Sequence, residues 1–120
     1  MNIPLVTGVG VGSTLLSAFD DALRACGALN YNLIPLSSVI PPASTVVPLP
    51  RYTSDPDEHG HRLYVVKAEV RSDDAGKRIG AGIGWYQWGD GHGACASNTR
   101  SRSCTSSAPR IERYSRVSDN

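Results

Sequence analysis

The chain has 120 residues, close to the usual size of one domain, which argues against a two-domain enzyme. Hydrophobic residues make up only 40%, so a single protomer can build no more than a modest core. The net charge of +1 gives no overall field toward nucleic acid or anionic lipid. We therefore expect neither a nucleic acid nor a membrane as a partner.

The charge is spread unevenly. Residues 1–93 carry nine acidic and seven basic side chains, whereas residues 94–120 carry five Arg and two acidic side chains. This second segment also holds seven Ser and only two large aliphatic residues, too little apolar surface to offset the entropy lost on ordering. We expect residues 1–93 to form the folded domain and residues 94–120 to be an aberrant or disordered tail.

Cysteine usage and the start of the chain predict a location. Cys26, Cys95 and Cys104 are odd in number and lack the paired spacing of a disulfide framework or a zinc ribbon. The first residues contain no basic region, and no run approaches the roughly 18 apolar residues of a spanning helix. We expect a cytoplasmic protein that is not exported.

The predicted elements begin with a strand over residues 3–11, whose glycines allow backbones to approach closely. A helix follows, with Ser13 or Thr14 as its N-cap and Gly27 after its last turn. The apolar residues of this helix recur at helical spacing: Leu16, Phe19, Leu23 and Cys26.

The rest of the chain reads mostly as strands and loops. A strand is predicted over residues 29–35, and a long loop over 43–60, which is rich in Pro, Asp and Ser. Strands are also predicted over 62–71 and 79–85, joined by a turn at 73–76, so we expect them to be antiparallel neighbours. A helix on an antiparallel sheet indicates a layered α+β fold.

Three common classes of site find no support. Gly8, Gly10 and Gly12 depart from the spacing of a dinucleotide-binding loop. The three histidines have no carboxylate or thiol at a metal-binding spacing, so no metal site is predicted. The chain also has no Gly-x-Ser-x-Gly motif of a serine hydrolase.

Two features have both an ordinary and a functional interpretation. Asp20 lies four residues before Arg24, the spacing of a surface ion pair, but its carboxylate could instead receive a cationic ligand. The hydroxyls of Ser37 and Ser38 could satisfy backbone groups in a turn. Alternatively, the Ser38 hydroxyl could attack the upstream peptide carbonyl in an N-to-O acyl shift.

Two stretches carry a family resemblance. Residues 17–23 read SAFDDAL and residues 30–42 read NYNLIPLSSVIPP. Together, and at this spacing, they strongly resemble the pyruvoyl-dependent arginine decarboxylases. The resemblance continues through VVPLP at 46–50 and IGAGIGW at 79–85, and covers about residues 3–93.

The resemblance implies a reaction. In this family the chain cleaves itself between two serines, which implies cleavage between Ser37 and Ser38 and conversion of Ser38 into a covalent pyruvoyl group. An ester formed through the Ser38 oxygen can eliminate to dehydroalanine, which loses ammonia to leave a ketone. Arginine is the implied substrate, and agmatine and carbon dioxide are the implied products.

The resemblance also implies site residues and a fold. Asp20 matches the aspartate that receives the substrate guanidinium, which carboxylate oxygens can grip bidentately. Asn32 matches an asparagine beside the cleavage site, and Leu16 matches a residue that lines the pocket. The implied fold is an αββα sandwich with antiparallel sheets, assembled as a homo-oligomer, a trimer, with active sites between protomers.

One part of the family pattern is missing. The family supplies a proton-donating glutamate just after the position of Gly93, where this chain reads ACASNTR. Codons permitted for these residues, read two bases later, encode the Val-Glu-His-Glu segment of bacterial members. We hypothesise that the reading frame shifted near Gly91 to Ala94, so that the true last strand and the helix after it are lost. An inactive fragment or pseudoenzyme, or an uncleaved small-molecule-binding domain that uses Asp20, are the alternatives.

Overall fold

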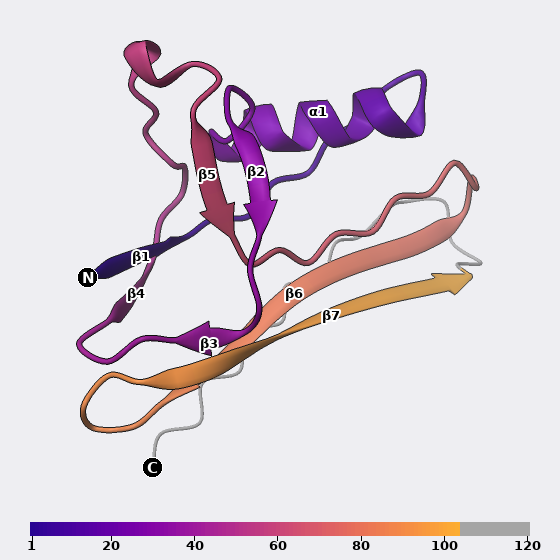
Figure 1. The fold of residues 1–120 in the computed structure, drawn as a ribbon. Helices are drawn as coiled ribbons and strands as arrows, with labels where there is room; N and C mark the ends of the chain where they lie inside the picture. Colours follow the sequence, from indigo (N-terminus) through magenta and orange to yellow (C-terminus); the bar gives the residue numbers. More distant parts are fainter. Residues whose placement is uncertain (104–120) are drawn as a thin grey trace. The chain divides into compact units, whose positions relative to one another are not determined.

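The structure is a computed structural model, and it describes residues 1–103. This part of the chain forms one α-helix, seven strands and a short 3-10 turn. It divides into two compact units, whose helix and strands are labelled in Figure 1. Unit 1 combines Met1–Leu36 with Ser44–Val65, and unit 2 combines Ser37–Ala43 with the chain from Val66 onward. One helix with several short sheets confirms the α+β class.

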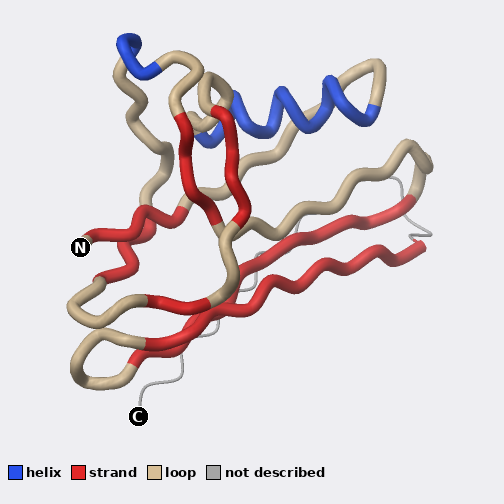
Figure 2. The backbone as a smooth tube through the Cα atoms, viewed as in Figure 1, coloured by secondary structure: helices blue, strands red, loops and turns tan. Residues whose placement is uncertain are grey.

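Unit 1 contains two pairs of short strands. β1 (Asn2–Leu5) pairs with β4 (Thr45–Pro48), and β2 (Asn32–Pro35) pairs with β5 (Arg62–Val65). Both pairs are parallel, so the expectation of antiparallel sheets is wrong for this unit. Figure 2 shows these strands as short stretches separated by loops. β4 also lies inside the segment predicted as a loop. Its β-branched residues favour a strand even though prolines surround them.

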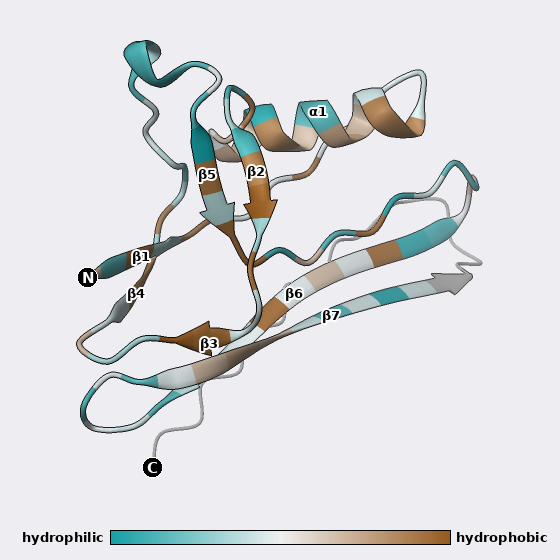
Figure 3. Cartoon of the chain, in the orientation of Figure 1, coloured by the Kyte–Doolittle hydropathy of each residue, from teal (hydrophilic) through white to brown (hydrophobic). Residues whose placement is uncertain are grey.

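Helix α1 (Leu15–Cys26) begins and ends where the sequence predicts. The Thr14 hydroxyl accepts a hydrogen bond from the Ser17 N–H at 3.0 Å, which caps the first turn. Gly27 ends the helix in the left-handed conformation at φ 89°. Apolar and polar residues lie on different sides of α1 (Figure 3). Cys26 is buried, but Leu16 at the other end of the apolar stripe is 63% exposed.

A glycine-rich segment over residues 8–12 lies directly against α1. A Cβ atom placed on Gly10 would lie 2.2 Å from the Ala22 nitrogen and 2.3 Å from the Ala18 oxygen. One on Gly8 would lie 2.2 Å from the Ala22 oxygen. Only glycine permits this contact between backbones, which confirms the predicted close approach.

Unit 2 is a three-stranded antiparallel sheet. Its order is β3 (Val39–Ile40), β7 (Gly93–Ser103) and β6 (Lys77–Gln87). β6 and β7 form a long hairpin, and its turn is closed by the Trp88 N–H, which donates to the His92 carbonyl at 2.8 Å. The predicted pairing of residues 62–71 with 79–85 is therefore wrong. The 11 residues of β6 have a partner of equal length in β7.

The tail predicted to be disordered contributes a strand. Residues 94–103 belong to β7, which pairs with β6 from Lys77↔Ser103 to Gln87↔Gly93. The prediction of disorder, and of a missing last strand, is thus wrong for this stretch. A strand ladder is made by backbone groups, so small polar side chains can occupy it. The rest of the predicted tail, with the missing helix, lies outside the described residues.

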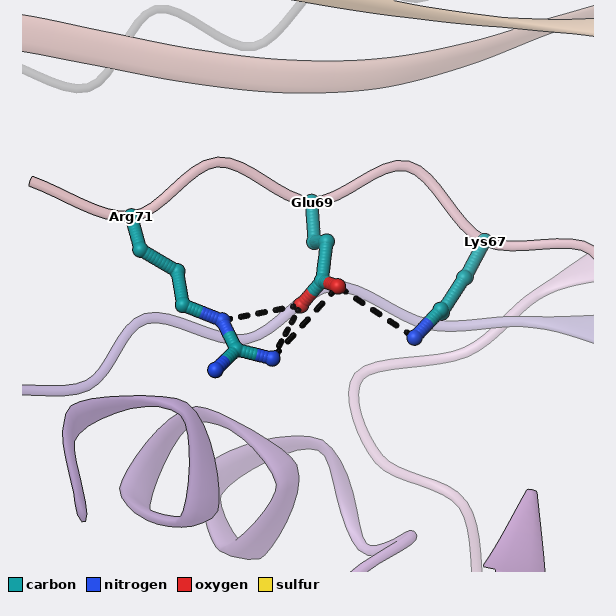
Figure 4. A network of polar contacts seen from close by, with 3 residues as sticks. All are labelled: Lys67, Glu69 and Arg71. Atoms are coloured by element: carbon teal, nitrogen blue, oxygen red, sulfur yellow. Dashed lines mark hydrogen bonds and ion pairs between the residues drawn. The ribbon is translucent and has the colours of Figure 1, made fainter. Parts of the chain in front are cut away.

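The predicted strand over 62–71 ends at Val65, and the chain beyond it carries a charged cluster (Figure 4). The Glu69 carboxylate contacts Lys67 Nζ at 3.3 Å and Arg71 Nη2 at 3.2 Å. All three side chains are partly exposed, so these ion pairs add little to stability.

The hydrophobic core is thin. Within residues 1–103, the buried hydrophobic residues are Cys26, Ala28 and Ile40, and no large side chain is fully buried. Several large hydrophobic side chains are exposed, among them Val39, Leu36 and Trp88. This confirms the modest core predicted from composition. None of the helices in the described part is long and apolar enough to cross a membrane.

The close contact between residues 8–12 and α1 predicts that adding one methyl group at Gly10 destabilises the fold. Gly10→Ala should lower the free energy of unfolding by about 3 kcal/mol, because the new Cβ overlaps backbone atoms that cannot move independently. Gly84→Ala is the matched control, since a Cβ there meets nothing within 4 Å. Urea denaturation of both variants measures the difference. Equal midpoints would show that the segment does not pack against the helix.

Candidate active site

Ser38 lies directly before β3 and is exposed, as is Ser37. Two groups of Cys95 contact the Ser38 carbonyl oxygen: the backbone N–H donates to it at 2.8 Å, and the Sγ atom lies 3.6 Å away. Within the described chain, neither serine hydroxyl has a hydrogen-bond partner. The interpretation in which these hydroxyls satisfy a turn is therefore not supported.

The segment 37–43 is anchored to the β6–β7 hairpin at both ends. Ile40 is buried and pairs with Gly93, where any Cβ atom would lie 1.9 Å from the Tyr86 oxygen. At the far end, the Ala43 N–H donates to the Asp90 carbonyl at 2.8 Å. Ala43 itself adopts a positive φ of 57°. Backbone contacts therefore fix the stretch that carries the two serines.

Asp20 lies on the exposed side of α1 and does not pair with Arg24. Instead, Arg24 Nη1 lies 3.8 Å from Asp21 Oδ1, and the other Asp21 oxygen accepts a hydrogen bond from the Val11 N–H at 3.0 Å. Within residues 1–103, the Asp20 carboxylate has neither an ion pair nor a hydrogen bond. The ion-pair interpretation of Asp20 is therefore wrong. The carboxylate is free to receive a cation, and the exposed Leu16 lies one helical turn before it.

Asn32 is held by a loop of unit 1. Its side-chain amide donates to the Gly60 carbonyl at 2.7 Å, and its backbone N–H donates to the His61 carbonyl at 2.8 Å. The neighbouring Tyr31 hydroxyl donates to the Glu58 carboxylate, and this bond, with burial, raises the pKa of Tyr31 to about 12. The proposed role of Asn32 beside the cleavage site stays a prediction.

Asp20, Leu16 and Asn32 thus belong to unit 1, and Ser37 and Ser38 to unit 2. Sequence reasoning missed Cys95, because its pairing with Ser38 joins positions far apart in the chain.

Residues 93–103 contain no Asp or Glu, so β7 offers no carboxylate at the place of the family glutamate. Within residues 1–103, no group of His, Cys, Asp and Glu side chains lies close enough together to hold a metal ion.

The contrast between neighbouring aspartates can be measured. Asp21→Asn should lower the free energy of unfolding by about 1 kcal/mol, because its carboxylate holds both the Val11 N–H and Arg24. Asp20→Asn should leave it unchanged within about 0.5 kcal/mol. Thermal denaturation of the two variants measures how much each substitution changes the free energy of unfolding. A larger loss for Asp20→Asn would mean that this carboxylate has a structural partner.

Comparison with known proteins identifies the family. A family model described as pyruvoyl-dependent arginine decarboxylase matches residues 2–116 and so extends past Gly93. The pyruvoyl-dependent arginine decarboxylase of Methanocaldococcus jannaschii is 39% identical over 81 residues, which cover 68% of this chain and 46% of that protein. The Halobacterium salinarum protein of the same name is 39% identical over 83 residues, covering 69% and 51%.

A third relative, from Methanococcus vannielii, carries the same name and is 39% identical over 71 residues, which cover 57% of this chain and 43% of that protein. The chain spans about half the length of the curated relatives it matches. The match over residues 2–116 nevertheless includes both unit 1 and the sheet that holds Ser38. The chain therefore belongs to the pyruvoyl-dependent arginine decarboxylase family, whose cofactor is a covalently bound pyruvoyl group.

Proposed function

We propose that this chain cleaves itself between Ser37 and Ser38 and then decarboxylates L-arginine to agmatine and carbon dioxide in the cytoplasm. The observation that carries the proposal is the Ser37–Ser38 pair in a chain of this family. Both serines are exposed, their hydroxyls have no partner in the described chain, and the Ser38 carbonyl is fixed by Cys95.

The proposed cleavage uses only groups of the chain and one water. The Ser38 hydroxyl oxygen adds to the Ser37 carbonyl carbon, and the peptide C–N bond breaks to give an ester and a free amine. Elimination then releases the Ser37 carboxylate and leaves a double bond between Cα and Cβ of residue 38. The resulting dehydroalanine tautomerises to an imine. Water hydrolyses this imine, which releases ammonia and leaves a ketone at residue 38. Ser37 ends the first fragment, and residue 38 begins the second.

The residues present fit the pyruvoyl group. Residue 38 would hold it covalently, and the Cys95 N–H already contacts the carbonyl that would adjoin the ketone. The bound group supplies an electron-accepting carbonyl for the loss of carbon dioxide. Asp20 would bind the substrate guanidinium through its two carboxylate oxygens, and Leu16 would contact the aliphatic part of arginine.

The proposal includes assembly into a trimer with αββα layers. Its support is the thin core, since one protomer leaves large hydrophobic side chains such as Val39, which is 75% exposed, in contact with solvent. Association of protomers would bury such residues.

The missing carboxylate on β7 favours a second candidate function, a processed but inactive member of the family. Self-cleavage needs Ser38 and its surroundings, whereas turnover also needs a proton donor. The shifted-frame hypothesis would account for the absence of this carboxylate, and the nucleotide sequence of the gene tests it. If the other frame encodes no alternating strand and amphipathic helix after Gly93, the hypothesis fails. If it does, the restored chain should decarboxylate arginine.

Two substitutions of Ser38 test the cleavage chemistry by intact mass spectrometry. Ser38→Ala removes the nucleophile and should leave one uncleaved chain. Ser38→Thr keeps a hydroxyl, so it should cleave and give a second fragment that is heavier by one methylene group than the wild-type fragment. Cleavage of the Ser38→Ala variant at this bond would rule out attack by the Ser38 hydroxyl.

Asp20 can be tested by arginine binding to the full chain. Asp20→Asn removes the charge that would hold the guanidinium, so it should weaken binding by about thirtyfold in calorimetry. Asp21→Asn is the matched control, because that carboxylate already contacts Arg24 and the Val11 N–H. Equal affinities of the two variants would remove Asp20 from the arginine site.

A further inference from the structure

We propose that Cys95 is a positioning residue for the processing of Ser38, because its backbone N–H and its thiol together hold the Ser38 carbonyl oxygen during elimination. The inference rests on the proposed self-cleavage and deepens it. It assigns a role to a residue of β7 that neither the motifs nor the spacing of the sequence single out.

Both contacts lie within unit 2 and meet at one oxygen atom. The Cys95 N–H donates to the Ser38 carbonyl at 2.8 Å, and Cys95 Sγ lies 3.6 Å from the same oxygen. The antiparallel pairing of Val39 with Ala94 and of Ile40 with Gly93 sets this register. Because Ile40 is buried against a position that only glycine can occupy, the register cannot easily slip.

The chemistry of elimination places charge on this oxygen. After the acyl shift, the Cα proton of residue 38 must leave, and solvent can receive it because the residue is exposed. The electron pair then passes onto the Ser38 carbonyl as an enolate. When the enolate re-forms the carbonyl, its electron pair makes the Cα–Cβ double bond. The Cβ–O bond then breaks, and its electrons leave with the Ser37 carboxylate. Donors already aimed at the oxygen stabilise the charged stage.

The thiol is suited to donate in this place. Partial burial raises the pKa of the Cys95 thiol, so it keeps its proton at neutral pH. A thiol is a weak donor, and it acts beside a backbone N–H that no side-chain substitution removes. Loss of the thiol should therefore slow elimination without abolishing it.

The experiment follows the full chain after cell-free synthesis, with samples quenched in acid and analysed by intact mass spectrometry. Hydroxylamine is added to matched samples, because it cleaves an ester but leaves a peptide bond intact. In Cys95→Ala, formation of the ketone-bearing fragment should slow by about tenfold relative to wild type, and ester should accumulate. Cys95→Ser keeps a hydrogen-bond donor and should restore the rate to within about threefold of wild type.

Cys26→Ala is the matched control. Its thiol also contacts a backbone carbonyl, that of Leu23 at 3.4 Å, but it lies on α1 in unit 1. Its processing rate should equal that of wild type. If Cys95→Ala processes as fast as wild type and accumulates no ester, the role of Cys95 is overturned while self-cleavage stands. If the wild-type chain itself gives neither ester nor fragments, the proposed self-cleavage fails, and this inference fails with it.

Discussion

The backbone pairing of β7 on both of its edges is the constraint on which the candidate active site depends. As the central strand of its sheet, β7 binds β6 along its whole length and β3 at its first residues. The short β3 has only two residues and could not hold a position alone. Its attachment to β7 fixes Ser38 beside Cys95, and so a polar segment of the chain determines where Ser38 lies.

The local elements of the fold could be predicted because their signals are local. Thr14 and Gly27 mark the ends of α1 through hydrogen bonds and a left-handed residue within a few positions of the helix. The glycines before the helix likewise indicate close backbone contact, and Gly10 makes it. The strand pairing could not be predicted in the same way. It joins distant positions, and the composition of residues 94–103 hides a strand that backbone hydrogen bonds stabilise.

The candidate site shows a similar division between what sequence indicates and what geometry decides. Helical spacing allows Arg24 to reach either Asp20 or Asp21, and only the structure shows that it contacts Asp21. Asp21 also accepts a hydrogen bond from the Val11 N–H, so one carboxylate holds the segment before the helix, whereas its neighbour Asp20 makes no such contact within residues 1–103. The motif around Ser37 and Ser38 indicates the family, but the contact between Ser38 and Cys95 is visible only in the fold.

The proposed function depends on the conversion of residue 38 into a ketone. The most direct measurement treats the full-length protein with a hydrazide reagent specific for aldehydes and ketones and locates the label by tandem mass spectrometry. We expect one label on the first residue of a fragment that begins at position 38. An unlabelled chain in which the bond between Ser37 and Ser38 is intact would contradict it.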